Sequence, residues 1–308
     1  MTKGTGHFEW LITPEFILIV IVILFKDPAH NMTSSALSRM GAWHDRRNDI
    51  GENQLFVLGD VHGQAHALEE ALACIAAIPR TAERRKLVFL GDPIDRGPQN
   101  LRAMHLVLNA QVAAHVDEVV LLPGNHELML LDALDNPLRY MGDWLDNGGV
   151  TVIAEAKPPA SVRLLCDFAE IAQRIAPSAF LAAIREAPSH HRLANLLLVH
   201  AGLSPDQIPE AFLKLPKAGA CGTHWAWIRR PFLDWRGGWG PEGRWLVVHG
   251  HTPAVRRLGD PSRFLALANR RHTHGRICLD AGAAYGLPQV GWAEFRADRF
   301  RLAISRAS

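Results

Sequence analysis

The chain has 308 residues, of which 48% are hydrophobic and 21% charged, as in an ordinary globular protein with ample length for a full core. Its formal net charge of +2 is too small to indicate nucleic acid or an anionic surface as a bulk partner. The four cysteines are widely separated and form no C-x-x-C pair, which argues against a disulfide framework and favours a reducing compartment.

The first unusual feature in chain order is an unbroken apolar run at 16–25, "FILIVIVILF". Leu11 and Ile12 extend this run toward the N-terminus, although Pro14 and Glu15 interrupt it. Because about 20 apolar residues are needed to span a bilayer, the segment at 11–25 is marginal. Three interpretations stay open: a short membrane anchor, an upstream segment included by a mis-assigned start, and a cleaved signal peptide. Basic residues after the run outnumber the single lysine before it, so an anchor would keep the rest of the chain in the cytoplasm. We therefore expect a cytoplasmic protein, tethered to the membrane only if this segment is a real anchor.

Residues 28–53 are polar and without periodicity, which indicates a linker, so we divide the chain into an N-terminal segment at 1–52 and one domain at 53–308. Beyond the linker, short apolar runs bounded by glycine or histidine are typical of buried strands. These runs are "LFVL" (55–58), "LVFL" (87–90), "VVLL" (119–122), "LLLV" (196–199) and "WLVV" (245–248). Between the first three of these runs, apolar residues recur at helical spacing at 64–78 and 98–115. We therefore expect an α/β fold that opens with a largely parallel section.

The stretch at about 128–193 carries apolar residues at helical spacing, broken by prolines and by Gly148-Gly149. We expect it to be a helical insertion that caps the site rather than a separate domain, because it contains no strand pattern of its own. The closing stretch at 277–305 is instead typical of short strands joined by glycine turns.

Polar residues follow each of the five strand-like runs, and in α/β sheets ligands collect at the carboxyl ends of strands. Carboxylates, a side-chain amide and imidazoles are a ligand set for divalent transition metals. Two such ions, about 3.5 to 4 Å apart, can share a carboxylate and hold a phosphoryl group between them. Turn residues that merely cap strands are the alternative explanation. The residues concerned are Asp60, His62, Asp92, Asn125, His126, His200, His249 and His251.

The motifs at these positions, in their order, resemble those of the bacterial PPP-type serine/threonine protein phosphatases within the calcineurin-like metallophosphoesterase superfamily. They are "GDVHG" (59–63), "GDPIDRG" (91–97), "GNHE" (124–127), "HAGL" (200–203) and "HGHT" (249–252). The resemblance implies an α+β sandwich of two mixed sheets flanked by helices, with a dinuclear metal site at the carboxyl ends of strands. It also implies two divalent ions, Mn²⁺ being the first choice, although Fe or Zn would suit the same ligands.

The resemblance also implies a role for individual residues in each motif. The metal ligands would be Asp60, His62, Asp92, Asn125, His200 and His251, with Asp92 bridging the two ions. His126 would be the general acid that protonates the leaving group, and Asp95 would orient and charge its imidazole. The nucleophile would be a water or hydroxide that bridges the metals.

Two arginines are expected to bind the phosphate, because a guanidinium fork matches phosphate oxygens. The first is Arg96, in the same motif as the bridging aspartate. The second would come from "HWAWIRRPFLDW" (224–235), where we choose Arg229 and keep Arg230 as its rival.

Several other residues have an ordinary explanation. We expect His249 to pack beside the site rather than bind a metal, and Glu127 to be structural. Core packing is the default for a cluster of tryptophans, with a platform that lines the substrate as the alternative. The cluster comprises residues 225, 227, 235, 239 and 245.

Three functions remain open at this point. The main interpretation is a phosphomonoesterase of the protein serine/threonine phosphatase type, whose partner is a phosphorylated protein or a small phosphoester. The alternative is a hydrolase of dinucleoside polyphosphates such as symmetrical tetraphosphates, or another nucleotide hydrolase of the same superfamily. The third is an inactive metal-binding scaffold. We rank the first highest because "DRG" keeps Asp95, which the dinucleotide-cleaving relatives lack. The complete set of ligands disfavours the scaffold, and the oligomeric state stays open.

Overall fold

The fold is that of a computed structural model, which describes residues 38–159, 162, 164–254, 264–265 and 274–307. The chain divides into two units, Met1–Thr33 and Ser34–Ser308, and every described residue belongs to the second. The apolar segment at 11–25 therefore lies outside the described residues. Of the helices in the described part, none combines the length and the apolar character that crossing a bilayer requires.

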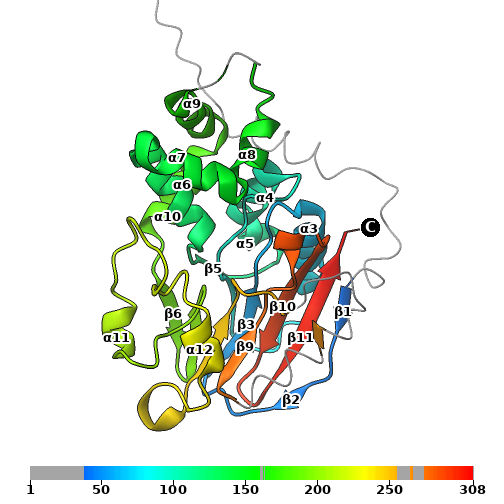
Figure 1. The fold of residues 1–308 in the computed structure, drawn as a ribbon. Coiled ribbons are helices and arrows are strands. Elements are labelled where there is room, and N and C mark those ends of the chain that lie inside the picture. Colours follow the sequence, from blue (N-terminus) through cyan, green and yellow to red (C-terminus); the bar gives the residue numbers. More distant parts are fainter. Residues whose placement is uncertain (1–37, 160–161, 163, 255–263, 266–273, 308) are drawn as a thin grey trace, which may run out of the picture. The chain divides into compact units, whose positions relative to one another are not determined.

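One sheet has seven strands in the described residues, in the order β1-β11-β10-β3-β4-β5, with β2 paired to β11 (Figure 1). The parallel neighbours β3, β4 and β5 form one half, and antiparallel pairs of β10 with β3 and with β11 form the other. The strands are β1 (Ser38–Met40), β2 (His44–Asp45), β3 (Asn53–Leu58), β4 (Arg84–Phe89), β5 (Glu118–Leu121), β10 (Gln289–Phe295) and β11 (Arg299–Arg306).

A second sheet has four strands in the described residues, in the order β6-β7-β8-β9. β7, β8 and β9 run parallel, whereas β6 is antiparallel to β7. The strands are β6 (His190–Leu193), β7 (Leu196–Val199), β8 (Leu246–His249) and β9 (Arg276–Cys278).

The two sheets pack face to face through alternate residues of their strands. Leu55 and Val57 of β3 lie in one apolar cluster with Leu196 and Leu198 of β7. Phe56 and Leu58 of β3 point to the opposite face, where they pack against helices. This alternation is the two-residue period of a strand buried on both faces. The expected sandwich of two mixed sheets flanked by helices is thus confirmed.

Helices cover the outer face of the larger sheet and extend beyond the ends of its parallel strands (Figure 1). The first group crosses between parallel strands, and the second forms the expected insertion. The crossing helices are α3 (Ala65–Ala77), α4 (Asn100–Leu108) and α5 (Ala110–Ala113). The inserted elements are α6 (Asn125–Asp135), α7 (Pro137–Trp144), the π-helix η1 (Leu145–Gly149), α8 (Val150–Glu155), α9 (Leu165–Ile175) and α10 (Ser178–Glu186).

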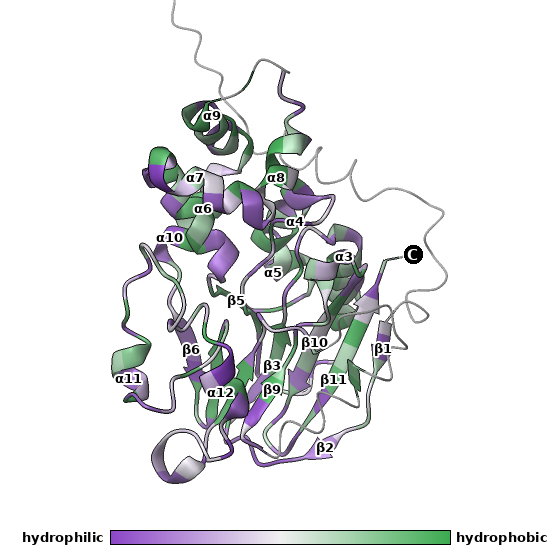
Figure 2. Cartoon of the chain, in the orientation of Figure 1, coloured by the Kyte–Doolittle hydropathy of each residue, from purple (hydrophilic) through white to green (hydrophobic). Residues whose placement is uncertain are grey.

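The insertion differs from its expected bounds at both ends. It begins at Asn125, inside the "GNHE" motif, and its last helix ends at Glu186, so residues 190–193 form strand β6 instead. Figure 2 shows that its helices carry both hydrophobic and hydrophilic residues, as expected of helices that pack on one side only. Short elements α11 (Pro209–Phe212), α12 (Arg230–Asp234), η2 (Pro241–Gly243) and η4 (Ala283–Tyr285) lie in loops.

The polar stretch expected to be a linker is partly ordered into strands. Within it, β1 and β2 both pair with β11 in antiparallel registers. Their residues show no alternation of apolar and polar side chains, so the sequence alone carries no strand signal there. The closing hairpin of β10 and β11 agrees with the expected pattern.

Candidate metal centre

The carboxyl ends of strands from both sheets deliver six buried polar residues to one place. They follow β3, β4 and β5 of the larger sheet and β7 and β8 of the smaller. Each is at most 5% exposed, so any charge among them is removed from bulk water. The six are Asp60, His62, Asp92, Asn125, His200 and His251.

Each of the three histidines has one ring nitrogen at hydrogen-bond distance from a main-chain carbonyl oxygen. A carbonyl accepts only, so that nitrogen carries the proton and the other nitrogen keeps its lone pair when the ring is neutral. The contacts are His62 Nδ1 to Ile94 O at 3.0 Å, His200 Nδ1 to Leu90 O at 2.8 Å, and His251 Nε2 to Trp227 O at 3.0 Å.

The remaining ring nitrogens converge on acceptor oxygens. His200 Nε2 lies 3.1 Å from Asn125 Oδ1 and 3.3 Å from Asp92 Oδ2. His251 Nδ1 lies 2.8 Å from the same oxygen of Asn125, and His62 Nε2 lies 3.6 Å from Asp92 Oδ2. Lone pairs that face one another in a buried site repel unless a cation lies between them. Histidines whose second nitrogen is fixed by a carbonyl are also the arrangement that metal ligands adopt.

Two groups of potential ligand atoms share one carboxylate. His62, Asp92 and His126 form the first, and Asp92, His200 and His251 form the second, with the atoms of each group within 4.8 Å of one another. The shared carboxylate is the one expected to bridge two ions. Asp60 was expected in the first group; its Oδ2 lies 3.9 Å from His62 Nε2. The donor set and its convergence fit two divalent cations.

Burial has the largest effect on the pKa values of two of the site's histidines. It lowers the pKa of His62 to about 3, with the charge of His126 acting in the same direction. It also lowers the pKa of His251 well below its usual value, aided by His200 and Arg229. Both imidazoles are therefore neutral at physiological pH, which is the form that binds a metal.

The carboxylates divide into two kinds. Burial, followed by the charges of Asp280 and Asp92, raises the pKa of Asp60 well above its usual value. At Asp92, burial also favours the neutral form, but the charges of His200 and His126 outweigh it and hold the pKa well below the ordinary range. Asp92 thus stays ionised, whereas Asp60 needs a nearby cation to do so.

The backbone at the site is held in an unusual conformation. Five of the predicted site residues have positive φ in the left-handed region, which non-glycine residues rarely adopt and which concentrates at functional sites. Main-chain N–H groups fix two carboxylates: His126 N donates to Asp92 Oδ1 at 3.0 Å, and His251 N donates to Asp60 Oδ2 at 3.0 Å. The five residues are His62, Asp92, Asp95, Arg96 and His251.

Two glycines allow this close approach. A Cβ atom at Gly124 would lie 2.1 Å from Asp92 Oδ1, and one at Gly250 would lie 2.0 Å from Asp60 Oδ1. Glu127, expected to be structural, accepts from the main-chain N–H groups of Asp92 and Gly124, each at 2.8 Å. Gly124 and Gly250 are therefore required by the carboxylates beside them.

A hydrogen-bonded chain of three side chains lies next to the donor cluster. His126 Nδ1 lies 2.7 Å from Asp95 Oδ2, and the indole N–H of Trp144 donates to the same oxygen at 2.9 Å. All three residues are buried. The pairing of His126 with Asp95 is as expected, and it leaves the histidine's Nε2 as the atom that can exchange a proton with a bound molecule.

The two predicted phosphate-binding arginines lie near different parts of the cluster. Both are exposed. The charge of Arg96 acts on His62, and that of Arg229 acts on His251, in each case lowering the pKa of the histidine after burial has done so. The exposed guanidinium groups are therefore placed to attract an anion to the cluster from two directions.

The helical insertion holds Arg96 in position. Arg96 donates from Nε to Asn147 O at 3.0 Å and from its main-chain N to Gly148 O at 3.2 Å. Gly148 has φ of 117°, and a Cβ there would lie 2.5 Å from Arg96 Cγ. Both contacts come from the π-helix η1, a type of element that is frequent at functional sites.

Sequence reasoning missed two buried residues of the site. Asp280, after β9, is 1% exposed and is hydrogen-bonded to Asp60, and burial raises its pKa to about 6. Its signal was available, because "ICLDAG" is another apolar run that ends in an aspartate before a glycine. Trp144 gave no such signal, since it lies at a helical position in the insertion.

His249 and three of the clustered tryptophans pack in the core. His249 is fully buried, and its ring meets that of Phe232 edge to face at 4.9 Å, in agreement with a packing role. The tryptophans that are no more than 5% exposed are Trp225, Trp239 and Trp245.

Comparison with known proteins places the chain in a family. The model of the calcineurin-like phosphoesterases matches residues 54–278, so the chain belongs to that family. Its fold is that of the metallophosphoesterases, and the expectation of a hydrolase of that superfamily is confirmed at this level.

Among curated proteins, the chain is similar to asymmetrical bis(5'-nucleosyl)-tetraphosphatases named PrpE. The Bacillus velezensis protein is 30% identical over 254 residues, covering 77% of this chain and 87% of the relative. The Bacillus cereus protein is 26% identical over 239 residues, covering 75% and 86%.

Solved structures resemble the chain more weakly. One, described provisionally as a diadenosine tetraphosphatase, has a TM-score of 0.47 and 18% identity, covering 85% of this chain and 97% of its own. A protein serine/threonine phosphatase from Saccharomyces cerevisiae has a TM-score of 0.46 and 17% identity, covering 85% and 82%.

Proposed function

We propose that the protein is a metal-dependent phosphohydrolase that cleaves dinucleoside polyphosphates asymmetrically, into a nucleoside monophosphate and the complementary longer nucleotide. Its similarity over most of its length to asymmetrical bis(5'-nucleosyl)-tetraphosphatases carries this proposal. The comparisons thus favour the alternative function, hydrolysis of dinucleoside polyphosphates, over the protein phosphatase that the sequence ranked first. The relatives are named as asymmetrical enzymes, whereas the sequence-based alternative took symmetrical tetraphosphates as its example.

Six residues would hold two divalent ions: Asp60, His62, Asp92, Asn125, His200 and His251. Such ions, Mn²⁺ in our expectation, supply Lewis acidity toward the phosphoryl oxygens and activate the attacking water. The support for this assignment is the convergence of buried lone pairs described above.

The remaining residues act on the phosphate and on its leaving group. Arg96 and Arg229 bind phosphate oxygens and neutralise charge that accumulates during the reaction. His126 donates a proton from Nε2 to the departing oxygen, while Asp95 holds its Nδ1–H and stabilises the charged imidazole. Trp144 fixes the orientation of the Asp95 carboxylate.

A second candidate, hydrolysis of phosphoserine or phosphothreonine in proteins, is favoured by the contact between His126 and Asp95. A serine or threonine alkoxide is a poor leaving group and needs a proton donor, whereas a nucleotide leaves readily as a phosphate anion. A histidine acid supported by an aspartate is therefore more useful for ester cleavage than for anhydride cleavage.

Side-by-side turnover separates the candidates. We expect Mn²⁺-loaded protein to cleave diadenosine tetraphosphate to adenosine mono- and triphosphate with a higher kcat/KM than it shows for a phosphoserine peptide. Faster cleavage of the peptide would restore the protein phosphatase. Failure to cleave diadenosine tetraphosphate, the peptide and p-nitrophenyl phosphate with any divalent metal would support the inactive scaffold.

A further inference from the structure

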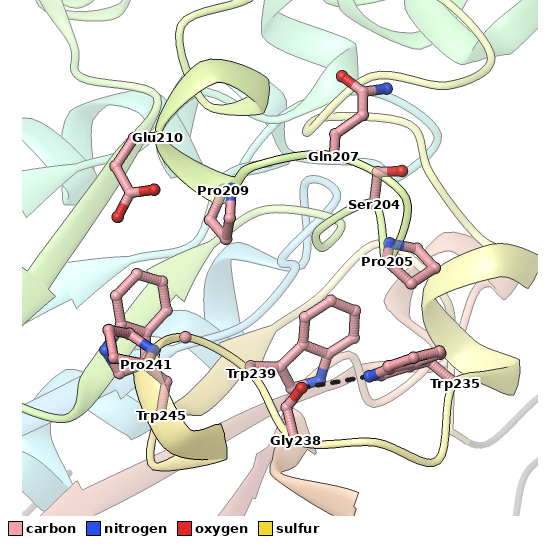
Figure 3. A pocket seen from close by; sticks show the side chains of 11 residues that line it. Ser204, Pro205, Gln207, Pro209, Glu210, Trp235, Gly238, Trp239, Pro241 and Trp245 are labelled. Carbon is pink, nitrogen blue, oxygen red and sulfur yellow. Dashed lines mark hydrogen bonds between the residues drawn. The ribbon is translucent and has the colours of Figure 1, made fainter.

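Two of the five clustered tryptophans are not fully buried. Trp235 is 39% exposed and, together with Trp239 and Trp245, lines a pocket of about 320 Å³ (Figure 3). The pocket's lining includes none of the predicted metal ligands, so it is set apart from the donor cluster. Trp227 is half-buried and is not among its lining residues.

Trp227 instead adjoins the metal centre. Its main-chain oxygen accepts the hydrogen bond from His251 Nε2, and its indole lies 6.0 Å from the His251 imidazole, centroid to centroid, at an interplanar angle of 78°. Arg229, a predicted phosphate ligand, is two residues further along the chain. The turn therefore presents an aromatic ring and a cation next to the same metal ligand.

The turn that carries Trp227 is firmly anchored. Trp225, Ala226 and Ile228 are each no more than 1% exposed, so the side chains on both sides of Trp227 are buried. Trp225 O accepts a hydrogen bond from Ala201 N at 3.0 Å, which ties the turn to the "HAGL" loop. Trp227 itself is half-buried: its ring packs against the core and its indole nitrogen is shielded from solvent. The side chain is therefore held in place before a ligand binds, and little of its conformational freedom remains to be lost.

We propose that the Trp227 indole is the stacking platform for the nucleobase attached to the phosphate that Arg229 binds. The inference rests on the proposed action on nucleotides and adds the residue that recognises the base. A base stacks on an aromatic side chain irrespective of its identity, so the platform selects nucleotides over base-free phosphates without selecting adenine over guanine.

The test compares two inhibitors that differ only by the base. Adenosine monophosphate and ribose 5-phosphate are each used to inhibit the hydrolysis of p-nitrophenyl phosphate. The inhibition constant of ribose 5-phosphate divided by that of adenosine monophosphate reports the contribution of the base. We expect wild-type protein to prefer the nucleotide by about tenfold or more. Trp227→Leu should bring the ratio close to one, and Trp227→Phe should keep most of it.

Trp235→Leu is the matched control, because it removes an exposed indole that lines the separate pocket and should leave the ratio unchanged. Since the ratio is measured within each variant, partial loss of folded protein does not alter it. A ratio near one in the wild type, an unchanged ratio in Trp227→Leu, or an equal loss in Trp235→Leu would overturn the inference. Absence of diadenosine tetraphosphate cleavage together with a high wild-type ratio would instead reject the proposed function alone.

Discussion

His126 Nδ1 lies 2.7 Å from Asp95 Oδ2, and this contact is buried from solvent. Burial raises the pKa of Asp95, and the hydrogen bonds from His126 and Trp144 counteract that rise. The carboxylate and the imidazole thus support each other, and removal of either should impair proton donation to the leaving group.

Asp95→Asn should lower kcat for p-nitrophenyl phosphate by less than it lowers kcat for phenyl phosphate. Phenolate is a poorer leaving group than p-nitrophenolate and depends more on the acid, whose contribution is about 10²- to 10⁴-fold. Steady-state rates on the two esters measure the difference. Equal losses on both would show that Asp95 acts on structure and not on proton transfer.

Trp144→Phe should also lower kcat more for phenyl phosphate than for p-nitrophenyl phosphate. We expect a smaller loss than in Asp95→Asn, about tenfold, because one hydrogen bond to the Asp95 carboxylate is removed. The ring remains to fill the core, so a modest fall in Tm is expected. A change in Tm without any change in the ratio of rates for the two esters would contradict the positioning role.

Arg229→Ala should lower kcat/KM for p-nitrophenyl phosphate by about 10- to 100-fold, because a charge-assisted contact to phosphate is lost. Arg230→Ala is the matched control, since it removes an adjacent exposed guanidinium and should change kcat/KM little. A larger effect of the second substitution would exchange the roles of the two arginines.

Asp280→Asn should stabilise the metal-free protein at pH 7.5 relative to wild type, and this gain should vanish near pH 4. The pKa of Asp280 is raised to about 6 in the folded protein, so the folded state binds its proton more tightly than the unfolded state does. Wild-type stability attributable to this group therefore falls as pH rises from about 4 to 6, by on the order of 1 to 3 kcal/mol.

Chemical denaturation of the two metal-free proteins at both pH values measures the effect. The same substitution should weaken Mn²⁺ binding, because the buried negative charge beside Asp60 is lost. A gain in stability that is the same at pH 4 and pH 7.5 would assign it to packing rather than to the carboxylate.

The strand ends and the polar side chains that they bring together could be predicted because each depends on a short local pattern. An apolar run followed by glycine and a polar residue fixes both the strand and the side of the sheet on which the ligand falls, as for Asp92 and His200. The β1 and β2 strands could not be predicted, since their pairing with β11 depends on a partner more than 250 residues away in sequence.

Contacts between the insertion and the site could also not be predicted from the sequence. Trp144 and Gly148 act on Asp95 and Arg96 across about 50 residues of chain, and nothing in their local pattern indicates that they meet. The substrate ranking rested on Asp95 alone, which bears on the leaving group and not on what else the substrate carries. Similarity to tetraphosphatases over most of the chain is the broader observation, and it favours nucleotides.

Titration of the metal-free protein with Mn²⁺, followed by electron paramagnetic resonance, tests the central claim most directly. Two groups of ligands share Asp92, so we predict two bound ions per chain whose spectra show magnetic coupling, and loss of that coupling in Asp92→Asn. Binding of a single uncoupled ion to the wild type, or a coupled pair that persists in Asp92→Asn, would contradict the account.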